Sequence, residues 1–478
     1  MKLSGFKRLA GIVLAAVMIG APLASTAFAQ SAAPADSSAA AAASAAAAAA
    51  PAVAQTSATP PVKLYGTDVV NSGDTAWMLT SAVLVLMMTI PGLALFYAGM
   101  VRKKNILATL AQSFGATCVI TVLWVVIGYS IAFTDGGKLN SFIGGFKYIM
   151  LAPMGLNVTS SLAPTIPESV YMFFQMTFAI ITPALIAGAL ADRMKYSAFL
   201  IFMGAWLLLV YCPIAHWVWG GGWLGAKGAL DFAGGTVVHL NAGTAGLVAA
   251  LMLGKRKGLG TENFAPHNLA YSVIGASLLW VGWFGFNAGS AVESHDGQAG
   301  MAAMATQLAT AAASLAWMFM EWIIAKKPSV LGMVSGAVAG LVAITPASGY
   351  VNPVGALAIG IAAGVVCYGS AVHLKKLIGY DDALDCWGVH GIGGALGAIL
   401  TGVFASNAIN SAAKGWIYDH NPGQMILQFE DVGATFGYCL VMSFIILAVL
   451  KYTIGIRVSE EVEEEGLDIN LHGEVVHG

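Results

Sequence analysis

Two histidines lie in matching contexts within strongly apolar stretches of this 478-residue chain. One stretch reads DFAGGTVVHLNAGTAG and the other DALDCWGVHGIGGALG. Each has the pattern Asp-x7-His-x3-Gly-x2-Gly, which is Asp231, His239, Gly243 and Gly246 in the first and Asp382, His390, Gly394 and Gly397 in the second. A neutral imidazole has one nitrogen that donates a hydrogen bond and one that accepts, and it titrates near neutral pH. A repeated histidine in an apolar setting therefore indicates a functional site.

Three kinds of chemistry fit a pair of buried histidines. The pair can be structural, with each ring hydrogen-bonded to nearby backbone. It can ligate a metal or a haem iron, although no cysteine or carboxylate is spaced to complete a metal site with His239 and His390. It can also line a conduction path, where two neutral rings share one N–H and face a small polar permeant. Polar groups at membrane depth are costly and usually functional, which favours conduction.

Aromatic and acidic residues precede the first histidine. Trp217, Trp219 and Trp223 lie in HWVWGGGWLGAKGALDFAGG, which ends just past Asp231. Tryptophan is common where a helix meets the membrane surface, and an aspartate at a helix start caps backbone N–H groups. Together, an acid and aromatic faces also attract a small cation. Glu168, near the start of another apolar segment, is expected to be partly solvated and is not assigned to the site.

The composition requires a membrane around these elements. The chain is 58% hydrophobic and 10% charged, whereas soluble domains carry about 25% charged residues. A net charge of -2 argues against a nucleic-acid partner. The five cysteines are scattered, without a CxxC pair, so we expect no disulfide framework, no metal and no cofactor. No catalytic set emerges, and we expect a protein that is not an enzyme.

The N-terminal region is predicted to lie outside the membrane fold. Lys2, Lys7 and Arg8 precede a short apolar core, and Ala27-Phe28-Ala29 is typical of a cleavage site, so residues 1–29 are predicted to be a cleaved signal peptide. Residues 30–70 are rich in Ala, Ser and Pro and favour a disordered tether.

Long apolar segments recur from residue 75 onward, and a spanning helix needs about 20 residues. We predict eleven spans, at 75–99, 105–133, 165–190, 196–217, 232–254, 267–291, 299–325, 330–347, 352–377, 387–405 and 430–454. Every second connection is basic, with Lys and Arg at 102–104, 193–195, 255–257, 326–327, 375–376 and 451–457. By the positive-inside rule the mature N-terminus is outside and the C-terminus is inside. The fold class is an all-α integral membrane protein, with a membrane domain at 71–457 and a cytoplasmic tail at 458–478.

The histidine pattern recurs in the fifth and tenth spans, and FYAG at 96–99 is echoed by FNAG at 286–289. Five spans per unit leave the second unit inverted, so we predict a 5+5 inverted repeat plus a C-terminal helix. Inverted repeats place a shared site near the membrane midplane, and we expect His239 and His390 to approach each other there. The glycines after each histidine are expected to allow close helix packing.

Several motifs resemble the ammonium transporter (Amt/Mep/Rh) family, bacterial Amt branch. They are AHWVWGGG with GALDFAGGTVVH, APHN at 265–268, GWFGFNAGS at 282–290, GVHG at 388–391, MTIPGLALFYAGMVRKKN, and EEGLDINLHGE in the tail. The resemblance runs from about residue 70 to residue 474. It implies a homotrimer in the bacterial inner (plasma) membrane, with one pore through each subunit.

The resemblance also implies roles for particular residues. It assigns ammonium binding at an outer vestibule to Phe178, Trp219 and Ser290 with Asp231 in support, a gate to Phe178 and Phe286, and pore lining to His239, His390 and Trp283. Phe174 is the alternative to Phe178, because FFQMTFAIIT departs from the family's pattern. Bringing an ion into hydrocarbon is costly, and desolvation lowers the pKa of a cationic acid. We therefore expect ammonium to deprotonate at the gate and ammonia to cross the apolar section.

In the tail, the acidic run Glu460 to Glu465 is expected to be solvated. The residues after it resemble the family's regulatory tail, which implies a PII-type nitrogen-signalling protein as cytoplasmic partner. The alternative function is an ammonium sensor of the same fold that signals through such a partner. A haem-binding redox protein and a channel for another small neutral solute, such as carbon dioxide, also stay open.

Overall fold

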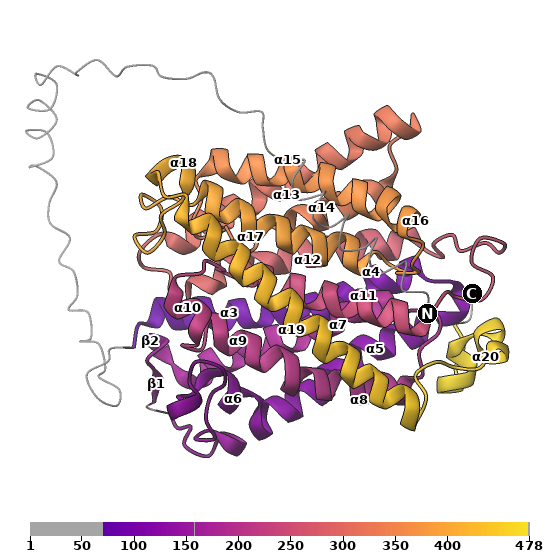
Figure 1. Cartoon of the computed structure of the whole chain (residues 1–478), viewed down its shortest axis with the longest axis horizontal. Coiled ribbons are helices and arrows are strands. Elements are labelled where there is room, and N and C mark those ends of the chain that lie inside the picture. The colour runs from indigo at the N-terminus through magenta and orange to yellow at the C-terminus, as the bar shows by residue number, and fades with distance from the viewer. Residues whose placement is uncertain (1–69, 157, 477–478) are drawn as a thin grey trace, which may run out of the picture. The chain divides into compact units, whose positions relative to one another are not determined.

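The computed structural model describes residues 70–156 and 158–476. The predicted signal peptide and, apart from residue 70, the predicted tether lie outside these described residues. The described chain is a bundle of helices that run alongside one another (Figure 1). Its β structure is one antiparallel pair, β1 (Thr159–Ser160) with β2 (Ala163–Pro167).

Within the described residues, ten helical runs are long and apolar enough to cross a membrane, and several combine α-helix with π-helix. They are α3–η1–α4 (Ser72–Met100), η2–α5–η3–α6 (Lys103–Phe133), α7 (Glu168–Leu190), α8–η6–α9–α10 (Tyr196–Lys227), η7–α11 (Gly235–Leu253), α12–η8 (Leu269–Ala291), α13 (Gln298–Ala325), α15–η9–α16 (Pro353–Ile378), η10–α17 (Trp387–Phe404) and α19 (Gly423–Thr453). The predicted all-helical membrane fold is confirmed.

The predicted span at 330–347 is a shorter helix, α14 (Val330–Ile344), of 15 residues. It ends where Thr345 N–H donates to the carbonyl of Val342 in a tight turn. Pro346 follows, and a proline has no backbone N–H with which to continue the helical hydrogen bonds. The sequence-based boundary is therefore three residues too long, although a helix does form at the predicted place.

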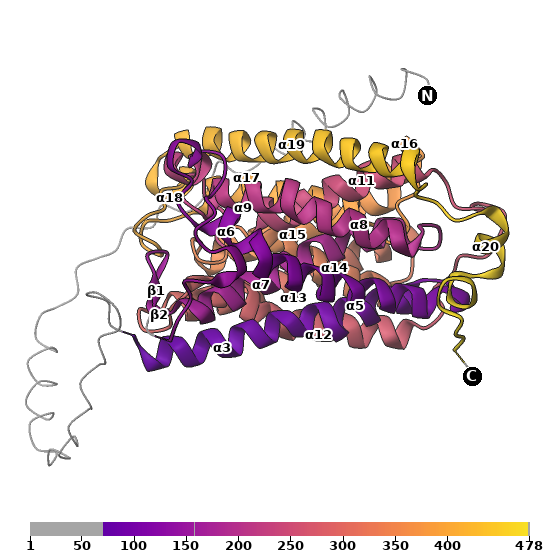
Figure 2. The same ribbon diagram turned by 90° about the horizontal axis from the view of Figure 1, so that it is seen from below.

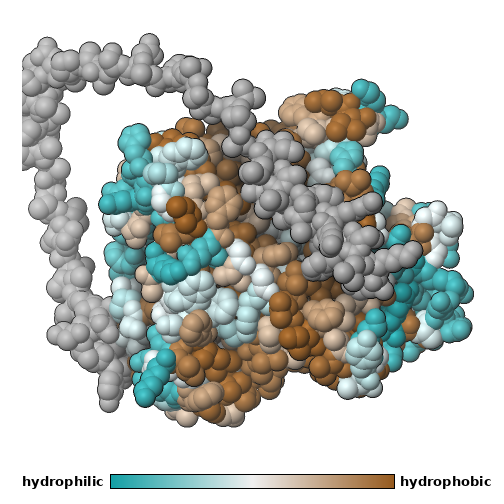
Figure 3. All heavy atoms as spheres, viewed as in Figure 1, coloured by the Kyte–Doolittle hydropathy of each residue, from teal (hydrophilic) through white to brown (hydrophobic). Residues whose placement is uncertain are grey.

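The helices differ in how much of their surface is exposed. Large apolar side chains such as Val83, Phe114 and Val449 are exposed on α3, α5 and α19, as expected of faces that contact lipid. By contrast, α7 is almost wholly buried. In the space-filling view, hydrophobic residues cover much of the middle of the molecule and hydrophilic residues gather toward its left and right edges (Figure 3).

The two ends of the bundle carry different structures (Figures 1 and 2). We call the end with β1, β2 and α18 (Trp416–Asp419) the hairpin end, and the end with α20 (Glu460–Glu465) and η11 (Asp468–His472) the tail end. Several predicted basic connections meet at the tail end. Arg102 and Arg256 both pair with buried Asp192 there, and Lys257 pairs with Glu460.

The glutamates of the acidic run in the tail are exposed, as predicted, except at Glu463, for which the prediction is wrong. This side chain is buried, accepts hydrogen bonds from Arg457 Nη2 at 2.7 Å and from the backbone N–H of Lys257 at 2.6 Å, and so ties α20 to the membrane domain. Asp468 likewise accepts from the backbone N–H groups of Leu107 and Ala108, at the start of α5. An anion at a helix N-terminus stabilises it, so the tail forms part of the fold.

Candidate functional site

The two histidines meet in the interior, as predicted. His239 lies in η7 (Gly235–Leu240) and His390 in η10 (Trp387–Gly391), both of them short π-helical segments. Their Nδ1 atoms are 3.3 Å apart, their ring centroids are 5.3 Å apart, and both side chains are buried. Two neutral rings at this distance share a single N–H hydrogen bond.

Glycines bring the two histidine segments together. A Cβ atom on Gly243 would lie 2.2 Å from the backbone nitrogen of Gly391, and one on Gly394 would lie 2.5 Å from the carbonyl oxygen of Gly235. Such separations are well inside van der Waals contact, so only glycine fits. The predicted close packing is confirmed, and it is what allows the imidazoles to touch.

Aromatic rings form a column on one side of the histidines. The ring of Phe286 stacks on Phe178 with centroids 4.1 Å apart and lies 5.8 Å from the ring of His239. Trp283 stacks on His239 at 5.3 Å, and its Nε1–H donates to Thr345 Oγ1 at 2.9 Å. The predicted gate pair and the predicted pore tryptophan are therefore adjacent to the histidine pair.

A cavity of about 270 Å³ lies beyond the Phe178–Phe286 pair. Its lining includes Leu162, Tyr171, Phe174, Gln175, Phe178, Val218, Trp219, Phe232, Ser290 and Val292. Three predicted site residues, Phe178, Trp219 and Ser290, thus share one cavity. Both candidate phenylalanines line it, but of the two only Phe178 is recorded in ring contact with Phe286.

Asp231 lies behind this cavity rather than in its lining. Its carboxylate accepts hydrogen bonds from the N–H groups of Gly234, Gly235, Thr236 and Val237 at 2.6–3.1 Å, and from Thr236 Oγ1 at 2.7 Å. The backbone oxygen of the same residue accepts from Trp219 Nε1–H at 2.8 Å. Asp231 therefore holds the first turn of η7 and the cavity tryptophan in one arrangement.

Asp382, at the same spacing before His390, has a sparser set of partners. Its Oδ2 accepts from the N–H of Trp387 at 2.7 Å, whereas its buried Oδ1 has no hydrogen-bond partner in the described part of the chain. Both aspartates thus reach the backbone N–H five residues ahead at the start of a histidine segment. They differ in the number of donors, because Asp231 accepts from four backbone N–H groups and a hydroxyl, whereas Asp382 accepts from one backbone N–H.

Asp431 is a buried acid that the sequence reasoning missed. It lies in α19, and its Oδ2 is 2.9 Å from Thr236 Oγ1, the hydroxyl that also contacts Asp231 Oδ2. The signal was present in the chain, because polar residues recur every fourth position on one face of an otherwise apolar helix. These buried residues are Asp431, Thr435, Cys439 and Ser443.

Glu168 was also misjudged, since it is buried rather than partly solvated. It accepts hydrogen bonds from Tyr129 Oη at 2.8 Å and Tyr148 Oη at 2.5 Å. These two phenols supply the donors that water was expected to supply, and they bind α7 to the neighbouring helix and loop.

The geometry of the histidine pair counts against haem. Axial ligands on opposite sides of an iron are held about 4 Å apart, since metal–imidazole bonds are about 2.0–2.1 Å long, and a porphyrin must fit between them. The two rings are in direct contact, and the helices that carry them touch backbone to backbone. No macrocycle fits between them in this arrangement.

Comparison with known proteins identifies relatives of the chain. The model of the Ammonium Transporter Family matches residues 76–477. The chain is 49% identical over 402 residues to the ammonium transporter of Bacillus subtilis, covering 84% of this chain and 98% of that protein. It is also 49% identical over 407 residues to the ammonium transporter of Aquifex aeolicus, covering 85% and 93%.

Solved structures have the same fold. Saccharomyces cerevisiae Mep2 superposes with a TM-score of 0.76 at 35% identity, over 82% of this chain and 88% of that one. A protein described as a sensor Amt protein superposes with a TM-score of 0.75 at 26% identity, over 84% and 98%. With a family match over most of its length and relatives at this level of identity, the chain is a multi-pass membrane protein of the ammonium transporter family.

Proposed function

We propose that this protein conducts ammonia across the bacterial inner membrane after recruiting ammonium at the hairpin end. The observation that carries the proposal is a continuous order of parts: a cavity, a stacked phenylalanine pair, and a histidine pair behind it. The hairpin end then faces outward and the tail end faces the cytoplasm, as the basic connections predict.

Recruitment uses weak attraction for a small cation. Trp219 and Phe178 offer aromatic faces, Ser290 offers a hydroxyl oxygen, and the Asp231 carboxylate lies behind them as a buried anion. The stacked rings of Phe178 and Phe286 offer no hydrogen-bond acceptor to a hydrated ion, so passage favours the neutral molecule. Ammonium leaves its proton on the cavity side and ammonia enters the apolar section.

The histidine pair then receives ammonia without a fixed charge. In the pair, one ring donates its Nδ1–H to the other, so the remaining nitrogens present one acceptor and one donor. His239 Nε2 is buried and has no partner within the described residues. That unpartnered nitrogen is the one we expect a permeating ammonia molecule to meet.

We infer further that Asp431 carries a proton. Thr236 has one hydroxyl hydrogen but contacts a carboxylate oxygen of Asp231 and of Asp431. Asp231 accepts from four backbone N–H groups, whereas among the described residues the Asp431 carboxyl contacts only this hydroxyl and Thr435 Oγ1, at 3.4 Å. The Asp431 acid therefore donates to Thr236, which donates to Asp231, and the chain of three groups is a candidate store for a proton beside the recruitment site.

Asparagine at position 431 should preserve the structure and remove that proton. The Asp431→Asn side chain keeps a donor for Thr236, so we expect the free energy of unfolding to change by less than about 1 kcal/mol. The infrared carbonyl band of a protonated carboxylic acid should be present in wild type and missing from the variant. An identical band in both proteins, or destabilisation by several kcal/mol, would contradict the assignment.

The test of the main function is ammonium-driven current or ammonia flux in proteoliposomes. Wild-type protein should conduct, protein-free liposomes should not, and His239→Ala should change the conducted species or its rate. Correctly folded wild-type protein that shows neither current nor flux with ammonium would contradict the proposal. An absorption spectrum with a haem band would instead support a haem-binding redox protein.

The protein is expected to bind two kinds of partner, further copies of itself and a signalling protein. Following the family resemblance, we propose a homotrimer, checked by the mass of the purified particle. We also propose a PII-type protein at the tail end, where α20 and η11 dock against the ends of the helices. A pull-down with the full chain should recover the PII-type protein, and a pull-down with a chain truncated after Arg457 should not. Equal recovery with both chains would show that the tail is not the binding site.

The sensor function is the second candidate. It is favoured by the likeness to a protein described as a sensor Amt protein. A sensor that does not conduct would respond to ammonium in its partner binding while remaining silent in the flux assay, which separates the two functions.

A further inference from the structure

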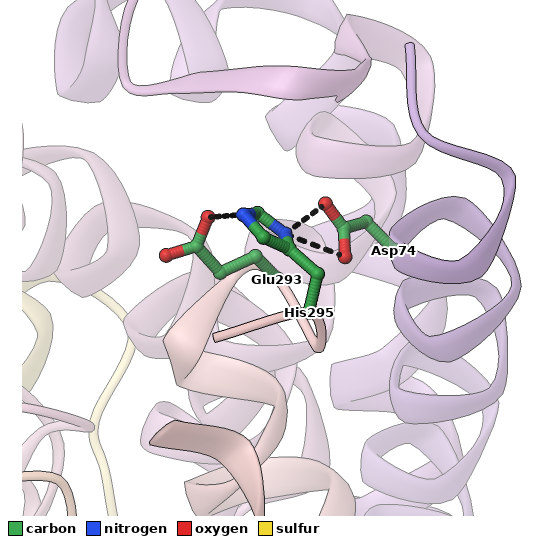
Figure 4. A group of neighbouring side chains, drawn as sticks. All are labelled: Asp74, Glu293 and His295. Atoms are coloured by element: carbon green, nitrogen blue, oxygen red, sulfur yellow. Dashed lines mark hydrogen bonds and ion pairs between the residues drawn. The ribbon is translucent and has the colours of Figure 1, made fainter. Parts of the chain in front are cut away.

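A buried carboxylate and a histidine join the first helix of the bundle to a loop at the hairpin end (Figure 4). Asp74 lies in the first turn of α3 and is fully buried. Glu293 and His295 lie in the loop between η8 (Gly289–Ala291) and α13, and the His295 side chain is half-exposed. The proposed transport mechanism uses none of these three residues, although their loop leads directly to the cavity that it does use.

Asp74 holds two consecutive residues of the loop. Its Oδ1 accepts hydrogen bonds from Ser294 N at 2.8 Å and from Ser294 Oγ at 3.2 Å, and its Oδ2 lies 3.0 Å from Nδ1 of His295. The backbone of Asp74 is itself fixed, because its N–H donates to the side chain of Asn71, the cap of α3, at 3.1 Å. The loop is therefore tied to a well-defined helix start.

The same loop supplies part of the cavity that Phe178 and Trp219 also line, which we call the recruitment cavity. Ser290 and Val292 both line this cavity. Val292 has a backbone φ of 61°, in the left-handed region, which is costly for a β-branched residue and persists only where other contacts hold it. Ser294 follows two residues later, so its bonds to α3 fix the chain directly after the strained position.

The helix α3 also holds this stretch on its other side. Trp77 Nε1–H donates to the carbonyl of Ala288 at 3.3 Å, directly before η8. Ser290 thus lies between two contacts with α3, one from Trp77 and one from Asp74. The position of the Ser290 hydroxyl in the recruitment cavity therefore depends on both contacts.

His295 is the member of this contact that titrates near neutral pH. The protonated imidazole forms an ion pair with Asp74, while its Nε2 lies 3.7 Å from Glu293 Oε2 on the other side. A neutral ring that keeps its proton on Nδ1 still donates to Asp74, but a charge-assisted hydrogen bond is about twice as strong as a neutral one. Loss of the charge therefore weakens the contact while the bonds from Ser294 remain.

The charged groups that face His295 are all acidic, Asp74 from α3 and Glu293 and Asp296 from its own loop. The hydrogen bond to Asp74, followed by the charges of these three carboxylates, raises the pKa of His295 above its usual value. A raised pKa means that the ion pair is complete below the usual histidine value and is lost as the pH rises through the raised one.

We propose that Asp74 and His295 are positioning residues for ammonium recruitment, which hold Ser290 and Val292 in the cavity wall most firmly when the outer medium is acidic. The inference rests on the proposed function, since it takes the cavity as the entry site for ammonium. Both side chains act through the loop. The path behind the phenylalanine pair is unchanged, so the contact should alter the ammonium concentration at half-maximal flux and leave the maximal flux as it is.

The test is ammonia flux in proteoliposomes at the same pH on both sides, with the pH varied through the titration range of histidine. In wild type, the concentration of ammonium ion at half-maximal flux should rise about 2- to 10-fold as His295 loses its proton, as expected when a charge-assisted hydrogen bond becomes neutral. His295→Asn should have the higher value at every pH, and Asp74→Asn should also lose the step. His420→Asn is the matched control, because His420 is another exposed histidine at the hairpin end, directly after α18, and should keep the step.

Hydrogen exchange of the purified full chain gives a readout that does not depend on transport. The backbone amides of residues 289–297 should exchange faster once His295 loses its proton, relative to an unstructured peptide at the same pH. The amide of Ser294 should change most, because it donates to Asp74. In His295→Asn these amides should exchange fast throughout the pH range.

Two results would overturn the inference. One is a half-saturating concentration that does not change with pH in wild type, or that changes equally in His295→Asn. The other is a pH step in exchange without a step in half-saturation, since the contact would then hold the loop without affecting recruitment. Absence of flux at every pH, together with the step in exchange, would instead contradict the proposed transport function. If Asp74→Asn does not fold, the half-exposed His295 position still decides the outcome.

Discussion

Replacing Asp231 with alanine is expected to abolish ammonia flux and to destabilise the protein strongly. The Asp231 carboxylate satisfies four backbone N–H groups and one hydroxyl in the buried first turn of η7. A buried donor left without a partner costs about 1–3 kcal/mol, so several kcal/mol should be lost. The flux should be measured in proteoliposomes, and stability by thermal unfolding in detergent.

The matched control is Asp382→Ala, the same substitution at the equivalent position before His390. Asp382 accepts from the N–H of Trp387 alone among the described side-chain contacts, and one of its oxygens has no partner. The Asp382→Ala substitution should lower the free energy of unfolding by less than Asp231→Ala does. If Asp231→Ala protein is as stable as wild type and conducts ammonium at the same rate, the role given to Asp231 is wrong.

A single methyl group at Gly243 should have an effect of similar size. The Cβ of Gly243→Ala would lie 2.2 Å from Gly391 N and 2.4 Å from its Cα, so α11 and η10 must move apart. Overpacking in a tight core costs about 1–3 kcal/mol. Separating these segments also pulls the two histidines out of contact, and we expect the ammonia flux to fall well below that of wild type.

Gly433→Ala provides the comparison for that experiment. Gly433 is also helical, in α19, but a Cβ there would meet no atom within 4 Å. Alanine favours helix over glycine, so Gly433→Ala should be as stable as wild type and should conduct. Equal behaviour of Gly243→Ala and Gly433→Ala, measured by unfolding and ammonia flux, would show that the close approach has no consequence.

The fold and the histidine pair could be predicted from the sequence because each follows from a simple rule. Membrane-spanning helices need long apolar runs, and the alternation of basic connections checks their order. The approach of His239 to His390 followed from an odd number of spans per repeat. Both inferences use periodicity and counting, which depend little on details of packing.

Asp431 and Glu168 were missed or misjudged because their partners come from distant parts of the chain. The Asp431 carboxyl meets Thr236, 195 residues earlier, and Glu168 meets Tyr129 and Tyr148 from neighbouring elements. A sequence pattern indicates that an acid lies in an apolar segment. Only the packed structure shows which hydroxyl replaces water around it.

The acidic tail illustrates a different reason for error. A run of glutamates normally extends into solvent because like charges repel. Here Glu463 faces Arg457 and the backbone of Lys257, while its neighbour Glu460 remains paired at the surface. One position in the run is buried because the helix α20 turns a single face toward the membrane domain, and composition cannot identify that face.

The π-helical form of η7 and η10 has a consequence for chain length. A π-helical turn holds one residue more than an α-helical turn, and each α-helical residue advances about 100° around the axis. Removing one residue from either segment would let the turn close as an α-helix, so the glycines after it would keep their direction while the histidine inside the turn would rotate away from its partner. The number of residues in these two turns is therefore as much a part of the site as the imidazoles themselves.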